Sequence, residues 1–190
     1  MSRNRYVGDY RIVESVDGRG RVRSDYEYIG APYAYAGDAQ AVKAARTRVA
    51  LCCLIGWAAW AAALFPVSAA MRSLYVALPF AFAAIPLALW AGTAVSLFRT
   101  REPFEHRHAD RLENRAPACT FFVALLGVLA LIGEAANALR GTQMLAGDAV
   151  FTACGAAVVA CAIAGHRQWK RLKCKKTDSC GDLPPQSPIP

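Results

Sequence analysis

A carboxylate and an amide interrupt one of the long apolar stretches of this 190-residue chain. Glu134 and Asn137 stand three residues apart in the run LIGEAANAL, residues 131–139, and on a helix this spacing places both on one face. An ionisable residue inside an apolar helix is a candidate for proton or cation handling. A cation needs several oxygen ligands, and only Asn137, Thr142 and Asp148 are expected near Glu134 at the same end of the helix.

Three roles are therefore open to Glu134. It can donate a hydrogen bond to a neighbouring helix in its protonated form, take part in ion or proton passage, or lie near the membrane interface. We favour the structural role, because no second charged group occurs in the apolar stretches to form a relay. The indole of Trp60, expected at a similar depth, is the predicted hydrogen-bond partner.

Small residues share the predicted helix face of Glu134. The stripe consists of Gly127, Ala130, Glu134, Asn137 and Gly141, and the next apolar stretch has a similar stripe of Ala153, Ala157, Cys161 and Ala164. Small side chains on facing stripes let two membrane helices approach closely. The pattern predicts that Glu134 and Asn137 face another helix and not lipid.

The helices that would position these groups follow from four charge-free stretches. Residues 49–67, 73–98, 116–133 and 149–165 contain no Asp, Glu, Lys or Arg, and apolar residues make up 55% of the chain. About 20 apolar residues span a bilayer as a helix. We predict an all-α membrane protein, a bundle of four transmembrane helices at about 49–67, 73–98, 117–139 and 148–166, with a small N-terminal cytoplasmic β-hairpin. Its parts are a cytoplasmic segment 1–37, a membrane domain 38–166 with a cytoplasmic loop 99–116, and a tail 167–190.

The Lys and Arg residues predict the orientation. Of the 22 in the chain, all but Arg72 and Arg140 lie before the first stretch, between the second and third, or after the fourth. Cytoplasmic loops carry an excess of these residues, so both termini and the middle loop are expected in the cytoplasm. The excess of Arg over Lys (17 against 5) and the abundance of Ala favour a bacterial cytoplasmic membrane.

The basic residues next to the spans predict contact with anionic lipid headgroups. These residues are Arg46, Arg48, Arg167, Lys170, Arg171 and Lys173. No nucleic-acid-binding motif accompanies the net charge of +8, so nucleic acid is not an expected partner. No phosphate loop, HExxH pair or nucleophile elbow occurs, so we expect neither an enzyme nor a cofactor or metal. In the tail, Cys174 is a candidate for lipidation.

The N-terminal segment alternates apolar and polar residues in two runs separated by Asp17-Gly18-Arg19-Gly20. This pattern predicts a β-hairpin over about residues 10–29. One face would carry Tyr10, Ile12, Val16, Val22, Tyr26 and Tyr28. A lone hairpin is marginally stable in water, so this face needs a cover, which can be a protein partner, a second copy, the membrane surface or the chain's own middle loop.

Two further features concern the first two spans. Trp57 and Trp60 fall near the middle of the first span and are expected to face other helices, because a buried indole N–H needs an acceptor. Pro79 and Pro86 predict a kink in the second span.

These features favour an integral membrane accessory subunit that docks a protein partner, or a second copy, through the hairpin and the basic face. The alternative is a small oligomeric channel or transporter subunit for ions or protons that uses Glu134.

Overall fold

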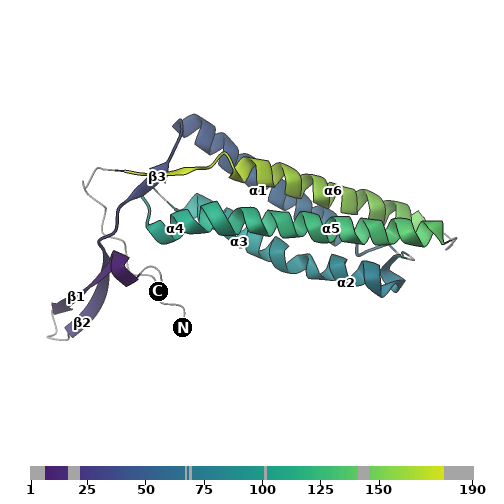
Figure 1. The fold of residues 1–190 in the computed structure, drawn as a ribbon, viewed down its shortest axis with the longest axis horizontal. Coiled ribbons are helices and arrows are strands. Elements are labelled where there is room, and N and C mark those ends of the chain that lie inside the picture. The colour runs from purple at the N-terminus through teal and green to yellow at the C-terminus, as the bar shows by residue number, and fades with distance from the viewer. Residues whose placement is uncertain are drawn as a thin grey trace.

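The computed structural model describes residues 7–16, 22–66, 68, 70–100, 102–140 and 146–177. Its α-helices are α1 (Ala39–Ala62), α2 (Leu74–Phe82), α3 (Ala84–Arg99), α4 (His106–Asp110), α5 (Ala116–Leu139) and α6 (Ala146–Trp169). Short helical turns are η1 (Val7–Asp9), η2 (Ala70–Arg72) and the π-helical η3 (Arg111–Arg115), and the strands are β1 (Tyr10–Val16), β2 (Val22–Tyr28), β3 (Tyr33–Tyr35) and β4 (Cys174–Lys176). The long helices pack into an elongated bundle, and the β1–β2 hairpin projects from one end of it (Figure 1).

Three helical segments of the described chain are long and apolar enough to cross a membrane. They are Leu74–Arg99 (α2 with α3), His106–Leu139 (α4 through α5) and Ala146–Trp169 (α6). The first predicted span, 49–67, falls on α1, which is not among them. Only its part from Val49 to Ala62 is both helical and free of charge, and at 1.5 Å per residue this part covers about 21 Å of a layer about 30 Å thick.

The second span has a helix break in the region where Pro79 and Pro86 predict a kink. The helix is interrupted at Ala83, between α2 and α3. Pro86 lies in the first turn of α3 and has no N–H to donate to the carbonyl of Phe82, one turn earlier. The helix then resumes, with the N–H of Leu87 donating to the carbonyl of Ala83 over 3.1 Å.

Both central indoles of α1 face the interrupted helix. Trp57 Nε1 donates to the carbonyl of Leu87 at 3.3 Å, and Trp60 Nε1 donates to the carbonyl of Phe80 at 3.0 Å. The prediction that these side chains face other helices is confirmed. The predicted bond from Trp60 to Glu134 is wrong, because the only N–H of the indole donates to a carbonyl beside the helix break.

The buried face of α5 is the one that the sequence predicts, whereas the buried face of α6 differs from the predicted one. Gly127, Ala130, Glu134 and Asn137 are buried on α5, whereas Gly141 lies outside the described residues. On α6, Ala153 and Ala164 are exposed, and the buried stripe is Asp148, Phe151, Gly155, Val158, Ala162, Gly165 and Trp169. The predicted stripe of α6 is therefore correct only in part, with Ala157 and Cys161 half-buried. Small and apolar residues surround this helix on all sides, so hydropathy does not distinguish its faces.

A small cap closes the end of the bundle from which the hairpin projects. We define the cap as β3, β4 and the segment from Phe104 to Asp110. Strand β3 pairs with β4 in antiparallel register, with Tyr33 opposite Lys176 and Tyr35 opposite Cys174, and Tyr33 also bridges to Phe104. The N-terminal segment, the middle loop and the tail are thus joined into one unit.

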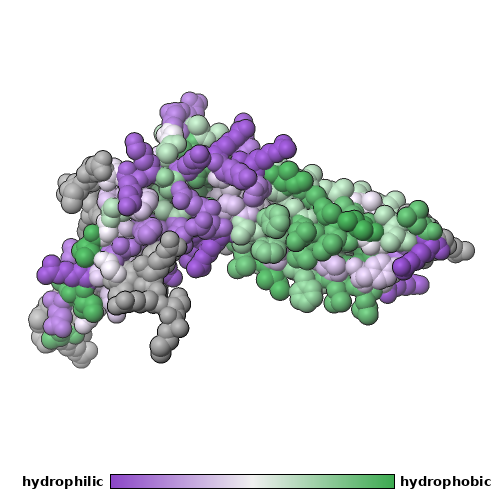
Figure 2. Space-filling model, in the orientation of Figure 1, coloured by the Kyte–Doolittle hydropathy of each residue, from purple (hydrophilic) through white to green (hydrophobic). Residues whose placement is uncertain are grey.

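The surface divides along the long axis of the bundle. Hydrophilic residues cover the cap and the neighbouring helix ends, and hydrophobic residues cover the flank toward the opposite, distal end (Figure 2). Leu54, Leu74 and Ile132 are examples of large side chains that are more than half exposed on this flank. Such a flank is typical of helices that contact lipid.

Candidate functional site

Two groups of residues carry the chemistry of the molecule: the hairpin with its contacts to the cap, and a polar cluster at the distal end of the bundle. In the hairpin, β1 and β2 pair with Tyr10 opposite Tyr28, Ile12 opposite Tyr26, and Val16 opposite Val22. Directly opposed residues of an antiparallel pair lie on the same face. This register places all six residues predicted for the apolar face on one face of the hairpin. The turn predicted at residues 17–20 lies outside the described residues.

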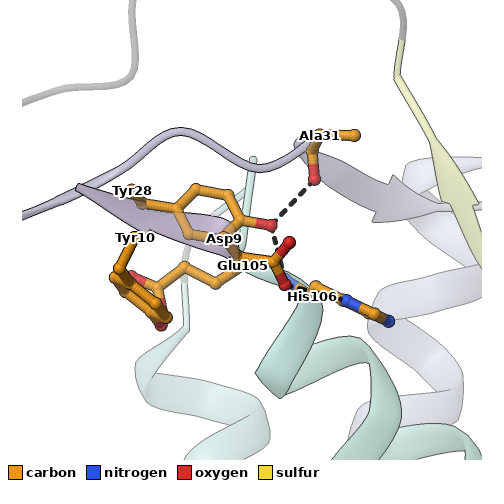
Figure 3. A network of polar contacts seen from close by, with 6 residues as sticks. All are labelled: Asp9, Tyr10, Tyr28, Ala31, Glu105 and His106. Atoms are coloured by element: carbon orange, nitrogen blue, oxygen red, sulfur yellow. Dashed lines mark hydrogen bonds and ion pairs between the residues drawn. The ribbon is translucent and has the colours of Figure 1, made fainter. Parts of the chain in front are cut away.

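The base of this face is bonded to the middle loop (Figure 3). The hydroxyl of Tyr10 donates to the carboxylate of Glu105 at 2.5 Å. The hydroxyl of Tyr28 donates to the carbonyl of Ala31 at 3.0 Å and accepts the backbone N–H of His106 at 2.9 Å. The imidazole of His106 lies 3.1 Å from the carboxylate of Asp9. These contacts hold the hairpin on the middle loop, although the two are distant in the sequence.

The environment of the two tyrosines keeps them protonated. Burial, and then the carboxylate of Glu105, raise the pKa of Tyr10 above its ordinary value, and burial also raises the pKa of Tyr28. Both phenols therefore remain hydrogen-bond donors at neutral pH. The side chain of Tyr28 lies against Gly30. A Cβ added at residue 30 would lie 2.6 Å from the hydroxyl oxygen of Tyr28, so this position requires glycine.

The other end of the same face is uncovered. Ile12, Val22 and Tyr26 are 62%, 65% and 74% exposed. We refer to these three residues as the hairpin tip patch. The chain's own middle loop covers only the Tyr10 and Tyr28 end, so the tip patch has no cover within the described residues.

The distal cluster forms where α5 ends and α6 begins. Asn137 is buried, its amide donates to Ser73 Oγ at 3.2 Å, and its carbonyl oxygen accepts the hydroxyl of Tyr75. Tyr75 in turn accepts a bond from Arg140 at 3.4 Å. These contacts tie the end of α5 to the start of α2.

Two carboxyl groups are buried in the same cluster. Asp148, in the first turn of α6, is 1% exposed and accepts the hydroxyl of Ser68 at 2.6 Å. Glu134 is 5% exposed and lies within the electrostatic influence of Asp148. Its Oε2 atom is buried without a hydrogen-bond partner among the described residues. A buried carboxyl oxygen that lacks a partner can accept a proton or a cation.

The cluster does not have the composition of a metal centre. Nowhere in the described part of the chain do three His, Cys, Asp or Glu side chains lie close enough to hold a metal ion. Thr142, which the sequence places nearby, lies outside the described residues. Ser68, Ser73 and Tyr75 were missed by the sequence analysis, although their place just before or inside the second span is a signal that they lie at the same membrane side as Glu134.

The basic residues predicted to contact lipid divide into two groups. Arg46 points into the cap, where its guanidinium lies 3.5 Å from the carboxylate of Glu102 and 4.5 Å from the ring centre of Tyr35. Arg48, Arg167, Lys170, Arg171 and Lys173 are exposed. Only the second group is therefore free of contacts with the cap and available for the predicted contact with lipid headgroups.

Cys174 lies in the cap, and its environment predicts low reactivity. Burial, and then the carboxylates of Glu113 and Glu102, raise the pKa of the Cys174 thiol to about 12. The backbone N–H of Cys174 also donates to Glu113 at 3.1 Å. Since the thiolate is the nucleophile, lipidation at this position is chemically disfavoured in the folded protein.

We predict that the native protein alkylates slowly at Cys174. At pH 8 the thiolate fraction is on the order of a thousandfold below that of a free thiol, so iodoacetamide labelling, followed by peptide mass spectrometry, should be slow by a similar factor. Glu113→Gln removes a nearby negative charge and should accelerate labelling, whereas Glu14→Gln, a matched change on the exposed hairpin, should not. Rapid labelling of the unchanged protein would contradict the half-buried position of this thiol beside Glu113.

Comparison of the chain with protein families, with characterised proteins and with solved structures gave no match. The class of the molecule therefore rests on its own geometry: a mostly helical chain with the long apolar helices of a membrane protein and a small N-terminal β-hairpin.

Proposed function

We propose that this chain is an accessory subunit of the cytoplasmic membrane, of bacterial type by its composition, that docks a protein partner through its hairpin. The observation that carries the proposal is the hairpin tip patch. Large apolar side chains exposed on a short hairpin mark an interaction surface. The bonds of Tyr10 and Tyr28 to the middle loop support it, because they hold the hairpin on the cap while its tip stays uncovered.

The hairpin also offers backbone groups for docking. Strands β1 and β2 form a two-stranded sheet, so the outer edge of each has N–H and C=O groups directed away from the pair. An extended segment of a partner can add to such an edge as a further strand, and adjacent side chains then supply the specificity. The partner of this proposal is a protein that combines an extended segment with an apolar contact to the tip patch.

The proposal includes four membrane spans with both termini and the middle loop in the cytoplasm. In its support, α1 packs along α3 and α6, so it shares the direction of the bundle. The cap also brings together the three segments that hold most of the Lys and Arg residues, while Arg72 and Arg140 lie at the distal end. This separation agrees with the positive-inside rule.

Site-specific cross-linking in native membranes tests the docking proposal. A photoreactive amino acid at position 26, in the tip patch, should form a protein adduct, and one at position 13, on the opposite face, should not. Adducts of equal yield at both positions would argue against a docking face.

A second function is favoured by a separate observation, the buried pair of Glu134 and Asp148 with an unpartnered oxygen of Glu134. In an oligomeric channel or transporter, these carboxyl groups would bind a proton or a cation inside each copy and so select cations. This function makes the distal cluster, and not the hairpin, the essential part of the molecule.

The ion-conducting function predicts a flux that depends on Glu134. The protein reconstituted in liposomes should pass protons or monovalent cations, measured with a pH-sensitive dye or a potassium-selective electrode. Glu134→Gln keeps the shape of the side chain but removes its charge and should abolish the flux, whereas Glu113→Gln, exposed on the turn η3, should not. If the unchanged protein shows no flux, or if the Glu134→Gln flux is unaltered, this second function is wrong.

A further inference from the structure

A cavity of about 380 Å³ that is open to the surface lies between the start of α1 and the end of α6, beside the cap. Val42, Ala45 and Arg48 line it from α1, and Gln168, Arg171 and Leu172 line it from the end of α6 and the residues after it. Its volume is at the lower end of the range for small-molecule sites. The cavity is large enough for a headgroup and a glycerol unit, but not for a whole lipid.

The lining of the cavity is suited to an anion. It contains two guanidinium groups and one side-chain amide, and none of the described lining residues is acidic. Neither Arg48 nor Arg171 forms a side-chain hydrogen bond or ion pair within the described residues. Both groups are thus available for a phosphate, to which arginine donates two parallel hydrogen bonds. Ala41, in the first turn of α1, also lines the cavity, where helix N–H groups lack helical partners.

With α1 as the first span of the proposed topology, the cavity lies in the membrane headgroup layer. Arg48 directly precedes the charge-free stretch that begins at Val49, and Arg171 follows the last residue of α6, Trp169, by two positions. This is the region where the hydrophilic end of the molecule meets its hydrophobic flank (Figure 2). Val42 and Leu172 add apolar surface to the same cavity. A ligand with a phosphate at one end and hydrocarbon at the other matches this arrangement.

We propose that this cavity binds the headgroup of an anionic phospholipid of the adjacent leaflet, with the phosphate between Arg48 and Arg171. Such binding would hold the start of α1 and the end of α6 together at the membrane surface. The inference does not depend on the docking function of the hairpin, since the cavity and the tip patch share no residue.

Native mass spectrometry of the full-length protein in neutral detergent tests the proposal. Dioleoylphosphatidylglycerol should bind about tenfold more tightly than dioleoylphosphatidylcholine, because the choline cation neutralises the charge of its own phosphate, whereas the phosphatidylglycerol headgroup keeps a net negative charge that attracts both arginines. The double variant Arg48→Gln/Arg171→Gln should lose this preference. The matched control Arg107→Gln/Arg115→Gln removes the same charge from exposed residues outside the cavity and should keep it.

A third variant distinguishes binding in the cavity from general attraction of anionic lipid to the basic surface of the protein. Ala41→Trp fills the cavity and leaves both arginines in place, and it should also reduce the binding of the anionic lipid. Equal losses in the two double variants would show a diffuse surface effect and overturn the proposal. Full displacement of the lipid by millimolar glycerol 3-phosphate would show that the ligand is a soluble phosphate, and this outcome also overturns it. Circular dichroism of each variant checks that the helices remain folded.

Discussion

Replacing Ile12 and Tyr26 together by glutamate should abolish partner capture while leaving the protein folded. The two residues face each other across the hairpin and are 62% and 74% exposed. Their replacement therefore removes little buried surface from the chain itself. In a docked complex, by contrast, each glutamate would place a charge in an apolar contact, and central residues of an interface typically contribute about 2 kcal/mol or more each. The loss of affinity should be at least about 100-fold.

Affinity purification from detergent-solubilised native membranes measures this effect. The control Val13→Glu alters the opposite face of the same hairpin, where Val13 is 37% exposed, and should retain the partner. A second control, Glu105→Gln, keeps an acceptor for the hydroxyl of Tyr10 and should also retain it. If the double variant recovers the same proteins as the unchanged chain, in the same amounts, the hairpin is not the docking surface.

Substitution of Gly165 by alanine should destabilise the bundle more than any exposed change. An added Cβ would lie 2.5 Å from Cζ2 of Trp90, and Trp90 is fully buried in the main core, beside Leu87 and Val158. The indole cannot move away without displacing its neighbours. Overpacking of this kind costs about 1–3 kcal/mol. A larger side chain, as in Gly165→Leu, should prevent the accumulation of folded protein.

Thermal unfolding in detergent, followed by circular dichroism, measures the effect. Gly92→Ala on α3 is the matched control, because an added Cβ there meets no atom within 4 Å, and helix propensity favours alanine over glycine by about 1 kcal/mol. Trp90→Phe lacks the outer indole carbons and should partly restore the stability of the Gly165→Ala variant. A Gly165→Ala protein with unchanged thermal stability would mean that α6 does not approach Trp90 as closely as described.

The local elements of this molecule follow from neighbouring residues. The hairpin was predictable because the alternation around Tyr10, Ile12, Tyr26 and Tyr28 has the period of a strand. The break between α2 and α3 was predictable from Pro79 and Pro86, because proline lacks the N–H of a helical hydrogen bond whatever residues surround it. The position of Glu134 on a buried face was likewise predictable from its small neighbours.

The contacts between distant segments were not predictable in the same way. Strands β3 and β4 contain three residues each, which is too short for a recognisable alternation, so the cap was not foreseen. The shared depth of Trp60 and Glu134 predicts a bond between them, but the indole donates to the carbonyl of Phe80 beside the helix break. The pairing of Ser68 with Asp148 joins residues eighty positions apart.

The sequence by itself determined that the chain has long apolar helices, a hairpin with one apolar face, and basic residues gathered in three segments. These properties depend on hydropathy and on local periodicity. Only the tertiary structure decided which side of α6 is buried, because its residues differ in shape more than in polarity. Val159 packs against Gly127, and Leu131 packs against Gly155. This matching of small and large side chains depends on both helices at once. The same reason applies to the cap and to the distal cluster, whose partners meet only after the helices have packed.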